Sequence, residues 1–183
     1  FRTDFALKYI VLPLGISFFT LQQLSYIIDR SWGTAPHYDF IEYLAYVSFF
    51  PQLIAGPIVL HSEIIPQFRD LEKRKFNATD FADGIILFSL GLIKKVLLAD
   101  VIALFVNEGF EKVHYLDTLS AWLISLCYAV ELYFDFSGYS DMAIGLGLMF
   151  GFKFLENFNY PLIASTITDF WRRWHISLSS WFK

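Results

Sequence analysis

The stretch Thr118-Leu-Ser-Ala-Trp-Leu-Ile-Ser-Leu-Cys-Tyr-Ala-Val-Glu-Leu-Tyr-Phe-Asp-Phe136 decides the fold class of this chain. It is mostly apolar over about 20 residues, the length at which an α-helix crosses a hydrocarbon core of roughly 30 Å. The whole chain has the same character, with 56% hydrophobic, 20% aromatic and only 17% charged residues and a mean hydropathy of +0.48. A soluble domain would expose large apolar patches with this composition. We therefore predict an all-α, polytopic membrane protein, with residues 118–136 as one crossing.

Further apolar stretches are predicted as membrane segments at residues 5–28, 41–60, 81–106 and 142–154. Pro13 and Gly15 predict a kink in the first, whose polar residues should face protein. The second carries Pro51 and Gly56 near its end, so the stretch 50–58 is either a broken segment that walls a pocket or the interfacial end of a helix. The last is short for a full crossing at about 1.5 Å per residue, and we expect it to tilt or to stop within the protein.

Charged residues inside residues 81–106 restrict how this segment lies in a membrane. A charge near the bilayer centre costs about 2.5–3.5 kcal/mol on insertion scales. Lys94 and Lys95 are therefore expected either to reach an interface or to pair with Asp100 inside the protein.

The polar loop predicted at residues 61–80 is the most basic part of the chain, with Arg69, Lys73, Arg74 and Lys75. The bias of basic loops toward the cytoplasm predicts a cytoplasmic position for it. Its charges are either a solvated face that sets the topology or a site for the phosphates of an acyl donor.

Polar residues interrupt the apolar pattern after Phe136. Gly138 is expected to break the helix and Ser140 to cap the next one. Carboxylates and hydroxyls at a break between apolar helices are costly unless they are used, and Glu131 and Asp135 lie close by on one face. Small-residue spacing that permits close helix contact follows at Gly145, Gly147 and Gly151.

An amphipathic helix is predicted at residues 167–183, because Thr166 and Asp169 have the spacing of a capping box. Asp169 should also pair with the residue four positions on, Arg173. On a continuous helix His175 shares a face with Trp171, Arg172, Leu178 and Ser179. A histidine beside a guanidinium, a hydroxyl and indole rings is either a proton-handling group or a structural hydrogen-bonder. The Arg172 charge would help to keep the ring neutral.

Five motifs in order resemble those of one family. They are Leu12-Pro-Leu-Gly-Ile-Ser-Phe-Phe19, Phe49-Phe-Pro-Gln-Leu-Ile-Ala-Gly-Pro57, Tyr133-Phe-Asp-Phe-Ser-Gly-Tyr-Ser-Asp-Met-Ala-Ile-Gly145, Glu156-Asn-Phe-Asn-Tyr-Pro161 and Asp169-Phe-Trp-Arg-Arg-Trp-His-Ile-Ser-Leu-Ser179. The chain resembles the membrane-bound O-acyltransferases, in the branch that contains the alginate O-acetyltransferase membrane subunit and the teichoic-acid D-alanyl transferase. The resemblance implies a fragment from the middle of a longer helical bundle with kinked and partly re-entrant helices and a tunnel.

The resemblance also implies the activity of the parent protein. An acyl group, most simply acetyl, passes from a cytoplasmic thioester such as acetyl-CoA toward an exported polysaccharide, directly or through an extracytoplasmic acyltransferase partner. No tightly bound cofactor, metal or nucleic acid is expected, and a single cysteine, Cys127, rules out a thiolate metal cluster. The expected location is the bacterial cytoplasmic (inner) membrane, in contact with lipid.

Two catalytic histidines are implied by the resemblance, and His175 matches the first. The second lies in a later segment, beyond Lys183, so the fragment alone is expected to be inactive. None of His37, His61 or His114 lies in a matching context. Expected substrate-binding residues are Trp171 and Arg172 beside His175, and Asp135, Ser137, Tyr139 and Asp141 along the tunnel. For Ser137 and Asp141, helix capping or buried hydrogen bonding is the competing interpretation.

Other function classes compete with acyl transfer. Broken helices and intramembrane carboxylates equally suit a secondary transporter or translocation subunit, although the sequence shows no internal repeat. Transfer of D-alanine to teichoic acid is a second alternative within the family. A third is a non-catalytic scaffold that docks an extracytoplasmic acyltransferase.

Overall fold

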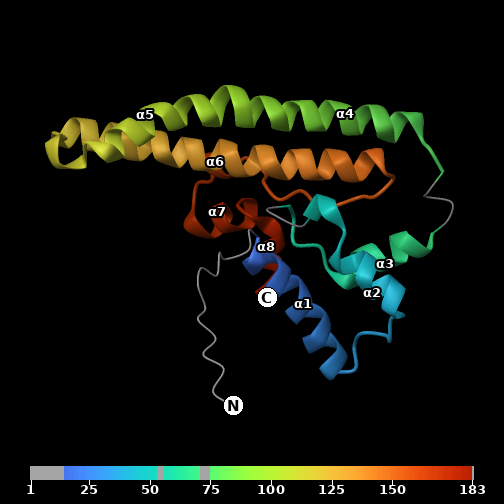
Figure 1. The fold of residues 1–183 in the computed structure, drawn as a ribbon. Coiled ribbons are helices and arrows are strands. Elements are labelled where there is room, and N and C mark those ends of the chain that lie inside the picture. Colours follow the sequence, from blue (N-terminus) through green and yellow to red (C-terminus); the bar gives the residue numbers. More distant parts are fainter. Residues whose placement is uncertain (1–14, 53–55, 71–74, 183) are drawn as a thin grey trace, which may run out of the picture.

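The computed structural model describes residues 15–52, 56–70 and 75–182, and these residues form helices and connecting loops without any strand. The predicted all-α class is confirmed. The helices form two groups (Figure 1). A long antiparallel pair makes one layer, and a set of shorter helices from both ends of the chain packs beneath it.

The long layer consists of two helical rods. One rod joins α4 (Ala78–Ile93), the π-helical turn η2 (Lys94–Ala99) and α5 (Asp100–Glu111) end to end. After the short η3 (Val113–Tyr115) the chain turns back as α6 (Thr118–Met149). The Asn77 side chain accepts a hydrogen bond from the Thr79 N–H at the start of the first rod, and Asp117 does the same for Ser120 at the start of the second. Caps therefore define where both rods begin.

The predicted break at Gly138 is wrong, because α6 continues through it to Met149. Ser140 therefore caps no helix, and the separate segment expected at residues 142–154 does not exist. Gly138 allows close contact with α4 and does not break the helix. A Cβ at Gly138 would lie 2.7 Å from the carbonyl oxygen of Gly91 on α4.

Two pairs of glycines bring α4 and α6 into backbone contact. Gly91 lies against Gly138, and Gly84 lies against Gly145, where an added Cβ would again be 2.7 Å from the facing carbonyl oxygen. The expected close contact at Gly145 is thus confirmed. Gly147 does not belong to this seam, since its Cβ would meet the Phe154 ring at 2.5 Å. The seam therefore fixes the register of the two rods.

Ion pairs join α6 to η2 at the Gly91–Gly138 end of the same seam. Lys94 Nζ lies 2.5 Å from Asp141 Oδ2, and Lys95 Nζ lies 2.6 Å from both Asp100 Oδ1 and Asp135 Oδ1. Of the two expected alternatives, pairing with Asp100 holds for Lys95, which also contacts Asp135 on α6, whereas Lys94 pairs with Asp141 on α6. These charges thus enter the apolar layer already paired.

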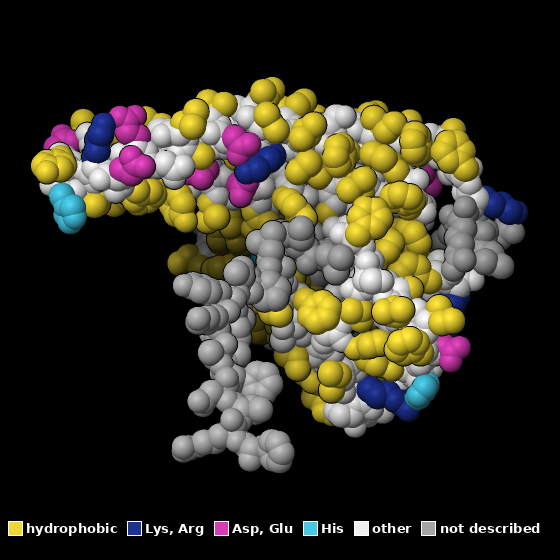
Figure 2. Space-filling model, viewed as in Figure 1, with side chains coloured by type: hydrophobic (Ala, Val, Ile, Leu, Met, Phe, Trp, Pro, Cys, Tyr) yellow, Lys and Arg dark blue, Asp and Glu magenta, His cyan; other side chains and the backbone are white. Residues whose placement is uncertain are grey.

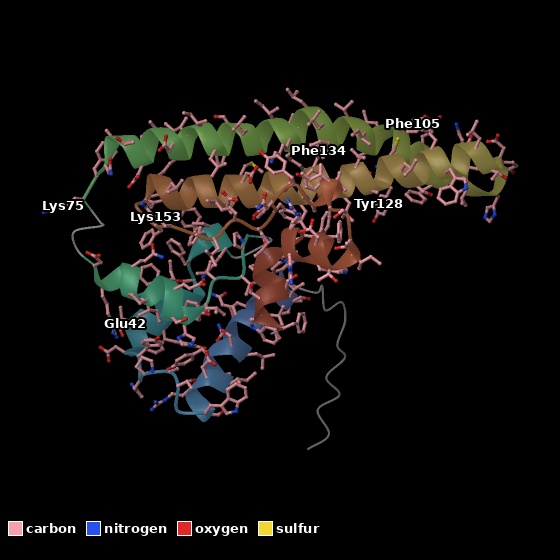
Figure 3. The ribbon with its side chains drawn as sticks, turned by 180° about the vertical axis from the view of Figure 1, so that it is seen from behind. Glu42, Lys75, Phe105, Tyr128, Phe134 and Lys153 are labelled. Atoms are coloured by element: carbon pink, nitrogen blue, oxygen red, sulfur yellow. The ribbon has the colours of Figure 1, made fainter. Side chains whose placement is uncertain are left out.

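One helix of the described residues, α6, is long and apolar enough to cross a membrane. Hydrophobic side chains cover much of the visible face of the long layer, with a small charged group near its middle (Figure 2). The reverse view places Phe105 and Tyr128 toward the end of the layer opposite Lys75 (Figure 3). Such exposed apolar surface on both rods is typical of a protein that contacts lipid or further membrane helices.

The second group begins with α1 (Ile16–Ser31), α2 (Phe40–Val47) and η1 (Phe50–Gln52). Gly15, with a φ of 75°, starts α1, while residues 5–14 of the predicted first segment, Pro13 included, lie outside the described residues. On α1, Gln22 and Ser25 are buried as expected for a side that faces protein. Helix α2 has 8 residues, roughly 12 Å of rise, which is too short to cross a membrane.

The helix α3 (His61–Arg69) replaces the first half of the predicted polar loop. The loop expected over residues 61–80 is therefore wrong for this part, whereas the basic residues Lys73 and Arg74 lie outside the described residues. Helix α3 folds because its apolar side has a core to enter. Ile64 and Ile65 are fully buried against Tyr46 and Val59.

The chain ends in η4 (Pro161–Ile163), α7 (Ile167–Arg173) and α8 (Ile176–Trp181). These short elements lie beneath α6 and beside the start of α1 (Figure 1). They bring the Arg-Arg-Trp-His segment against the middle of the long helix.

The contact of Gly84 with Gly145 and of Gly91 with Gly138 predicts that replacing one of these glycines by alanine destabilises the protein. Alanine normally stabilises an exposed helix interior relative to glycine by roughly 1 kcal/mol. Gly91→Ala should instead lower the free energy of unfolding by about 1–3 kcal/mol, because its Cβ would lie 2.5 Å from the Gly138 carbonyl oxygen. Gly109→Ala is the comparison for a side-chain clash, since the three nearest atoms to its Cβ would all belong to the Ile124 side chain, Cδ1, Cγ1 and Cγ2, and none to a facing backbone. Thermal unfolding of the full-length protein in detergent measures both, and equal midpoints for the two variants would contradict the seam.

Candidate functional site around His175

The predicted continuous helix over residues 167–183 is interrupted at His175. Helix α7 begins at Ile167 as expected, with Thr166 Oγ1 accepting from the Asp169 N–H at 3.0 Å. The expected pair of Asp169 with Arg173 is also present, at 2.9 Å. His175 then adopts φ 46° and ψ 57°, the left-handed region, and α8 begins at the next residue. Such a conformation costs a non-glycine residue roughly 1–3 kcal/mol and persists only when surrounding contacts impose it.

Asn157 supplies those contacts. Its backbone carbonyl accepts from the Ile176 N–H at 2.9 Å. Its side-chain Oδ1 accepts from the Ser177 N–H at 3.1 Å and from the Ser177 hydroxyl at 2.9 Å. The Ser177 oxygen in turn accepts from the Ile58 N–H at 3.0 Å. Asn157, only 1% exposed, thus binds the chain directly after His175 and fixes the turn.

Aromatic rings surround the His175 side chain. Its ring centroid lies 4.7 Å from that of Phe136 on α6, 6.0 Å from Phe18 on α1 and 6.4 Å from Phe158 in the loop before η4. This burial lowers the pKa of His175 to about 4. The imidazole is therefore neutral at pH 7, with one nitrogen able to accept a hydrogen bond or a proton.

Trp171 and Arg172 do not have the positions expected of them. The left-handed residue redirects the chain, so the two no longer lie one helical turn before His175 on a shared face. Trp171 packs edge-on to Phe170 and is 54% exposed, and Arg172 is also exposed. The expectation that Arg172 keeps the ring neutral is wrong, since burial is the cause.

The four α6 candidates have different surroundings. Asp135 and Asp141 are held in the ion pairs with Lys95 and Lys94. Ser137 is fully buried beside Phe136, and its hydroxyl has no hydrogen-bond partner among the described residues. Helix capping is excluded for Ser137 and Asp141 because α6 is unbroken around them, and the Asp141 carboxylate accepts a half-buried hydrogen bond from Lys94. Tyr139 is half-buried on the same helix.

Sequence reasoning missed Gln52 and Asn157. Both are at least 96% buried, and each has one side-chain atom without a partner in the described part of the chain, Oε1 of Gln52 and Nδ2 of Asn157. Both residues lie in motifs that carry the family resemblance, Gln52 in residues 49–57 and Asn157, beside a second asparagine, in residues 156–161. Their burial depends on tertiary contacts that the motif alone does not reveal.

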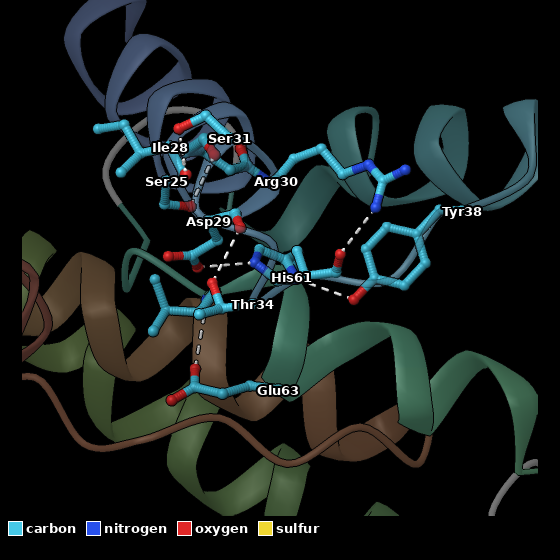
Figure 4. Close-up of polar contacts among 12 residues, drawn as sticks. Ser25, Ile28, Asp29, Arg30, Ser31, Thr34, Tyr38, His61 and Glu63 are labelled. Carbon is cyan, nitrogen blue, oxygen red and sulfur yellow. Dashed lines mark hydrogen bonds and ion pairs between the residues drawn. The ribbon is translucent and has the colours of Figure 1, made fainter.

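His61 is the other buried histidine and has a different role. Its Nδ1 lies 2.8 Å from the Tyr38 hydroxyl and its Nε2 lies 2.9 Å from Asp29 Oδ2, so both nitrogens have partners (Figure 4). It thereby ties α3 to α1 and to the loop before α2. His37 and His114 are exposed. In contrast, the Nε2 of His175 is buried and has no partner among the described residues.

The arrangement can handle a proton without a metal ligand set, and the described residues hold no group of three or more metal-binding side chains. A neutral imidazole with an unpartnered nitrogen can donate to, or accept from, a group brought beside it. The aromatic wall keeps water away and so strengthens that interaction.

Comparison with known proteins identifies the family. The sequence model of the membrane-bound O-acyltransferase family matches residues 14–183. The peptidoglycan O-acetyltransferase of Helicobacter pylori is 46% identical over 209 residues, covering 100% of this chain and 39% of the relative. The probable alginate O-acetylase AlgI of Pseudomonas aeruginosa is 49% identical over 180 residues, covering 98% of this chain and 34% of the relative.

A more distant relative extends the comparison. The teichoic acid D-alanyltransferase of Bacillus subtilis is 31% identical over 175 residues, covering 93% of this chain and 43% of the relative. The chain thus spans about two fifths of the length of these curated relatives. With the family match over residues 14–183 and identities of this size, the chain belongs to the membrane-bound O-acyltransferase family.

Proposed function

We propose that the full-length protein is an O-acyltransferase that moves an acetyl group from a cytoplasmic acyl thioester such as acetyl-CoA toward an exported polysaccharide. The observation that carries the proposal is His175, a neutral, buried imidazole with an unpartnered Nε2, in a chain that belongs to this family. The chain covers about two fifths of its relatives, so the proposal concerns the whole protein.

The chemistry of the proposal is attack of an acceptor hydroxyl on the thioester carbonyl. The new C–O bond forms, the C–S bond breaks, and a base takes the hydroxyl proton while the thiolate leaves. The base in this scheme is a second histidine beyond Lys183. His175 orients the donor or stabilises the negative charge that develops on the carbonyl oxygen.

Acetyl is preferred to D-alanyl as the transferred group. The relatives named for O-acetylation are 46% and 49% identical to this chain, and the relative named for D-alanyl transfer is 31% identical. No residue of the described site selects one group by its chemistry. Family membership also favours acyl transfer over the transporter alternative.

The setting of the reaction follows from the same proposal. We place the protein in the bacterial cytoplasmic membrane, where a cytoplasmic thioester and an exported acceptor face opposite sides. The acetyl group then passes to the polysaccharide itself or to an extracytoplasmic acyltransferase partner. An apolar helix of membrane-spanning length, α6, supports this setting.

The first test is substitution of His175. His175→Ala in the full-length protein should lower transfer of labelled acetyl from acetyl-CoA to cell-surface polysaccharide about hundredfold or more, the size of a lost group that stabilises developing negative charge. His114→Ala is the control, because its side chain is exposed. Membranes with matched protein levels are compared. Undiminished labelling with His175→Ala would make His175 a packing residue.

Asn157 should affect the rate of acetyl transfer indirectly, because its hydrogen bonds hold the turn that positions His175. Asn157→Ala removes two hydrogen bonds to Ser177, each worth roughly 1 kcal/mol. We expect lower thermal stability and, at a temperature where the variant stays folded, a kcat that falls more than KM rises. Asn159→Ala is the matched control, since this side chain is exposed in the same loop. A variant with reduced stability and unchanged kcat would limit Asn157 to folding.

The lowered pKa of His175 predicts how stability depends on pH. An unfolded histidine binds its proton near pH 6.5, whereas the folded one does so near a pKa of about 4. Protonation therefore favours the unfolded chain, and the contribution of the neutral ring is complete above pH 6.5 and is lost as the pH falls toward 4. Unfolding midpoints between these values should fall less for His175→Gln than for wild type. Parallel curves for the two proteins would contradict the burial of this histidine.

A further inference from the structure

The ion pairs between η2 and α6 leave an excess of negative charge. Lys94 is matched by one carboxylate, that of Asp141. Lys95 is shared by two carboxylates, since its Nζ lies 2.6 Å from both Asp100 Oδ1 and Asp135 Oδ1. The group around Lys95 therefore contains one carboxylate more than its single cation can neutralise.

Glu131 adds a further carboxylate to the same side of α6. It lies four residues before Asp135, the spacing at which two side chains on a helix are neighbours. Its Oε2 is buried and has no hydrogen-bond partner in the part of the chain that the structure describes. We call Lys95, Asp100, Glu131 and Asp135 the Lys95 cluster. A second cation beside this cluster would offset its excess of negative charge.

The Lys95 cluster is open on one side. The side chains of Lys95, Asp100 and Asp135 are 39%, 50% and 48% exposed. Large apolar side chains on the same stretches of the two rods, Leu97 and Leu132, are exposed as well. Figure 2 shows charged side chains among apolar ones near the middle of the long layer. Whatever covers this surface must therefore meet both charge and apolar side chains.

The position of the cluster along α6 corresponds to the interior of a membrane. The turn between α5 and α6 carries exposed charged and aromatic residues, Lys112, Tyr115 and Asp117, of the kinds found at a membrane surface. Glu131 and Asp135 follow Asp117 by 14 and 18 residues, which is roughly 21 and 27 Å along a helix. Both carboxylates thus lie within a hydrocarbon core of roughly 30 Å that begins at this turn.

Neither lipid nor bulk water fits such a surface. A charge that faces lipid at this depth is costly, and ionisable side chains inside membranes pair with one another for this reason. Exposed apolar side chains such as Leu97 and Leu132 are in turn unsuited to a water-filled surface. A membrane helix that carries one basic residue satisfies both requirements. Its apolar side chains pack on the leucines, and its cation offsets the excess carboxylates.

The same chain can supply this helix. The chain described here spans about two fifths of the length of its curated relatives. A full-length protein of their size therefore has more residues outside this region than within it, enough for further membrane helices.

We propose that the Lys95 cluster is the docking site for a further membrane helix of the full-length protein, which places a lysine or arginine beside Glu131 and Asp135. The covering helix lies outside residues 1–183. The proposal rests on the ion pairs, the exposed carboxylates and their depth along α6. It is independent of the acyl-transfer chemistry.

Photocrosslinking of the full-length protein in its membrane identifies what covers the cluster. Tyr128→p-benzoylphenylalanine introduces the crosslinker at an exposed position one helical turn before Glu131 and leaves the cluster intact. We expect a crosslink within the same chain, to a peptide outside residues 1–183 that has a lysine or arginine within about one helical turn of the attachment point.

Trp122→p-benzoylphenylalanine is the matched control, because Trp122 is an exposed aromatic residue elsewhere on α6. Its crosslinks should be unaffected by Asp135→Asn, whereas the yield from position 128 should fall. Absence of a crosslink from position 128 overturns the proposal. Attachment there to lipid only, to a second copy of the protein, or to a peptide without a basic residue overturns it as well.

The sign of a stability change gives a second readout. With a covering cation in place, Glu131→Gln leaves that cation unpaired, so the thermal unfolding midpoint of the full-length protein should fall by several degrees. Without a covering cation, the same substitution removes an uncompensated charge and the midpoint should rise. Glu108→Gln is the matched control, since Glu108 pairs with Lys112 in an exposed salt bridge that contributes little. An unchanged or raised midpoint for Glu131→Gln overturns the proposal.

Exchange of the two charges then tests direct pairing. Glu131→Lys alone should lower the midpoint, and replacing the crosslinked basic residue by glutamate in the same protein should restore most of the loss. No restoration overturns the pairing of Glu131 with that residue. Crosslinking and unfolding need no substrate, so a failure here leaves the acetyl-transfer result unaffected, and a protein without acetyl transfer can still show the docked helix.

Discussion

The backbone contact between α4 and α6 is the constraint on which the rest of the structure depends. Gly84 and Gly91 on one rod and Gly138 and Gly145 on the other allow an approach that any side chain would prevent. With the register fixed in this way, the carboxylates of α6 meet the lysines at η2, and two charges that would be costly in an apolar layer are neutralised. Another side of α6 presents Phe136, whose ring lies 4.7 Å from the His175 ring.

The backbone at His175 is strained, and the His175 ring is shielded from water. Both features have an identifiable source. The left-handed backbone is imposed by Asn157, which binds the two residues that follow. The shielding of the ring from water comes from Phe18, Phe136 and Phe158, which belong to three separate parts of the chain. A histidine on a regular helix would share its surface with neighbours three and four residues away. In this protein the helix is broken at His175, so its side chain lies against Phe136 of α6 and not beside Trp171.

The sequence predicted the helical class, the start of α7 and the Asp169–Arg173 pair, because each depends on composition or local spacing. It also offered pairing with Asp100 as one of two alternatives for the two lysines, and this alternative holds for Lys95. It did not predict that α6 continues through Gly138. A glycine within an apolar run suits a break and a close contact equally, and the choice depends on a glycine 47 positions away, Gly91. The break at His175 was missed for a similar reason. Nothing within the segment 167–183 forbids a helix, and the hydrogen bonds that impose the turn come from Asn157.

Stability alone does not account for the interior beside α6. Apolar residues at the two buried serines would satisfy packing and remove the cost of their unpartnered hydroxyls. The left-handed turn adds a further cost to the same region. The contact between the two rods of the long layer, in contrast, is made by glycine backbone and by paired charges. The strained turn and the neutral imidazole of His175 therefore lie against a long helix, α6, whose own position is fixed by backbone contact and by paired charges.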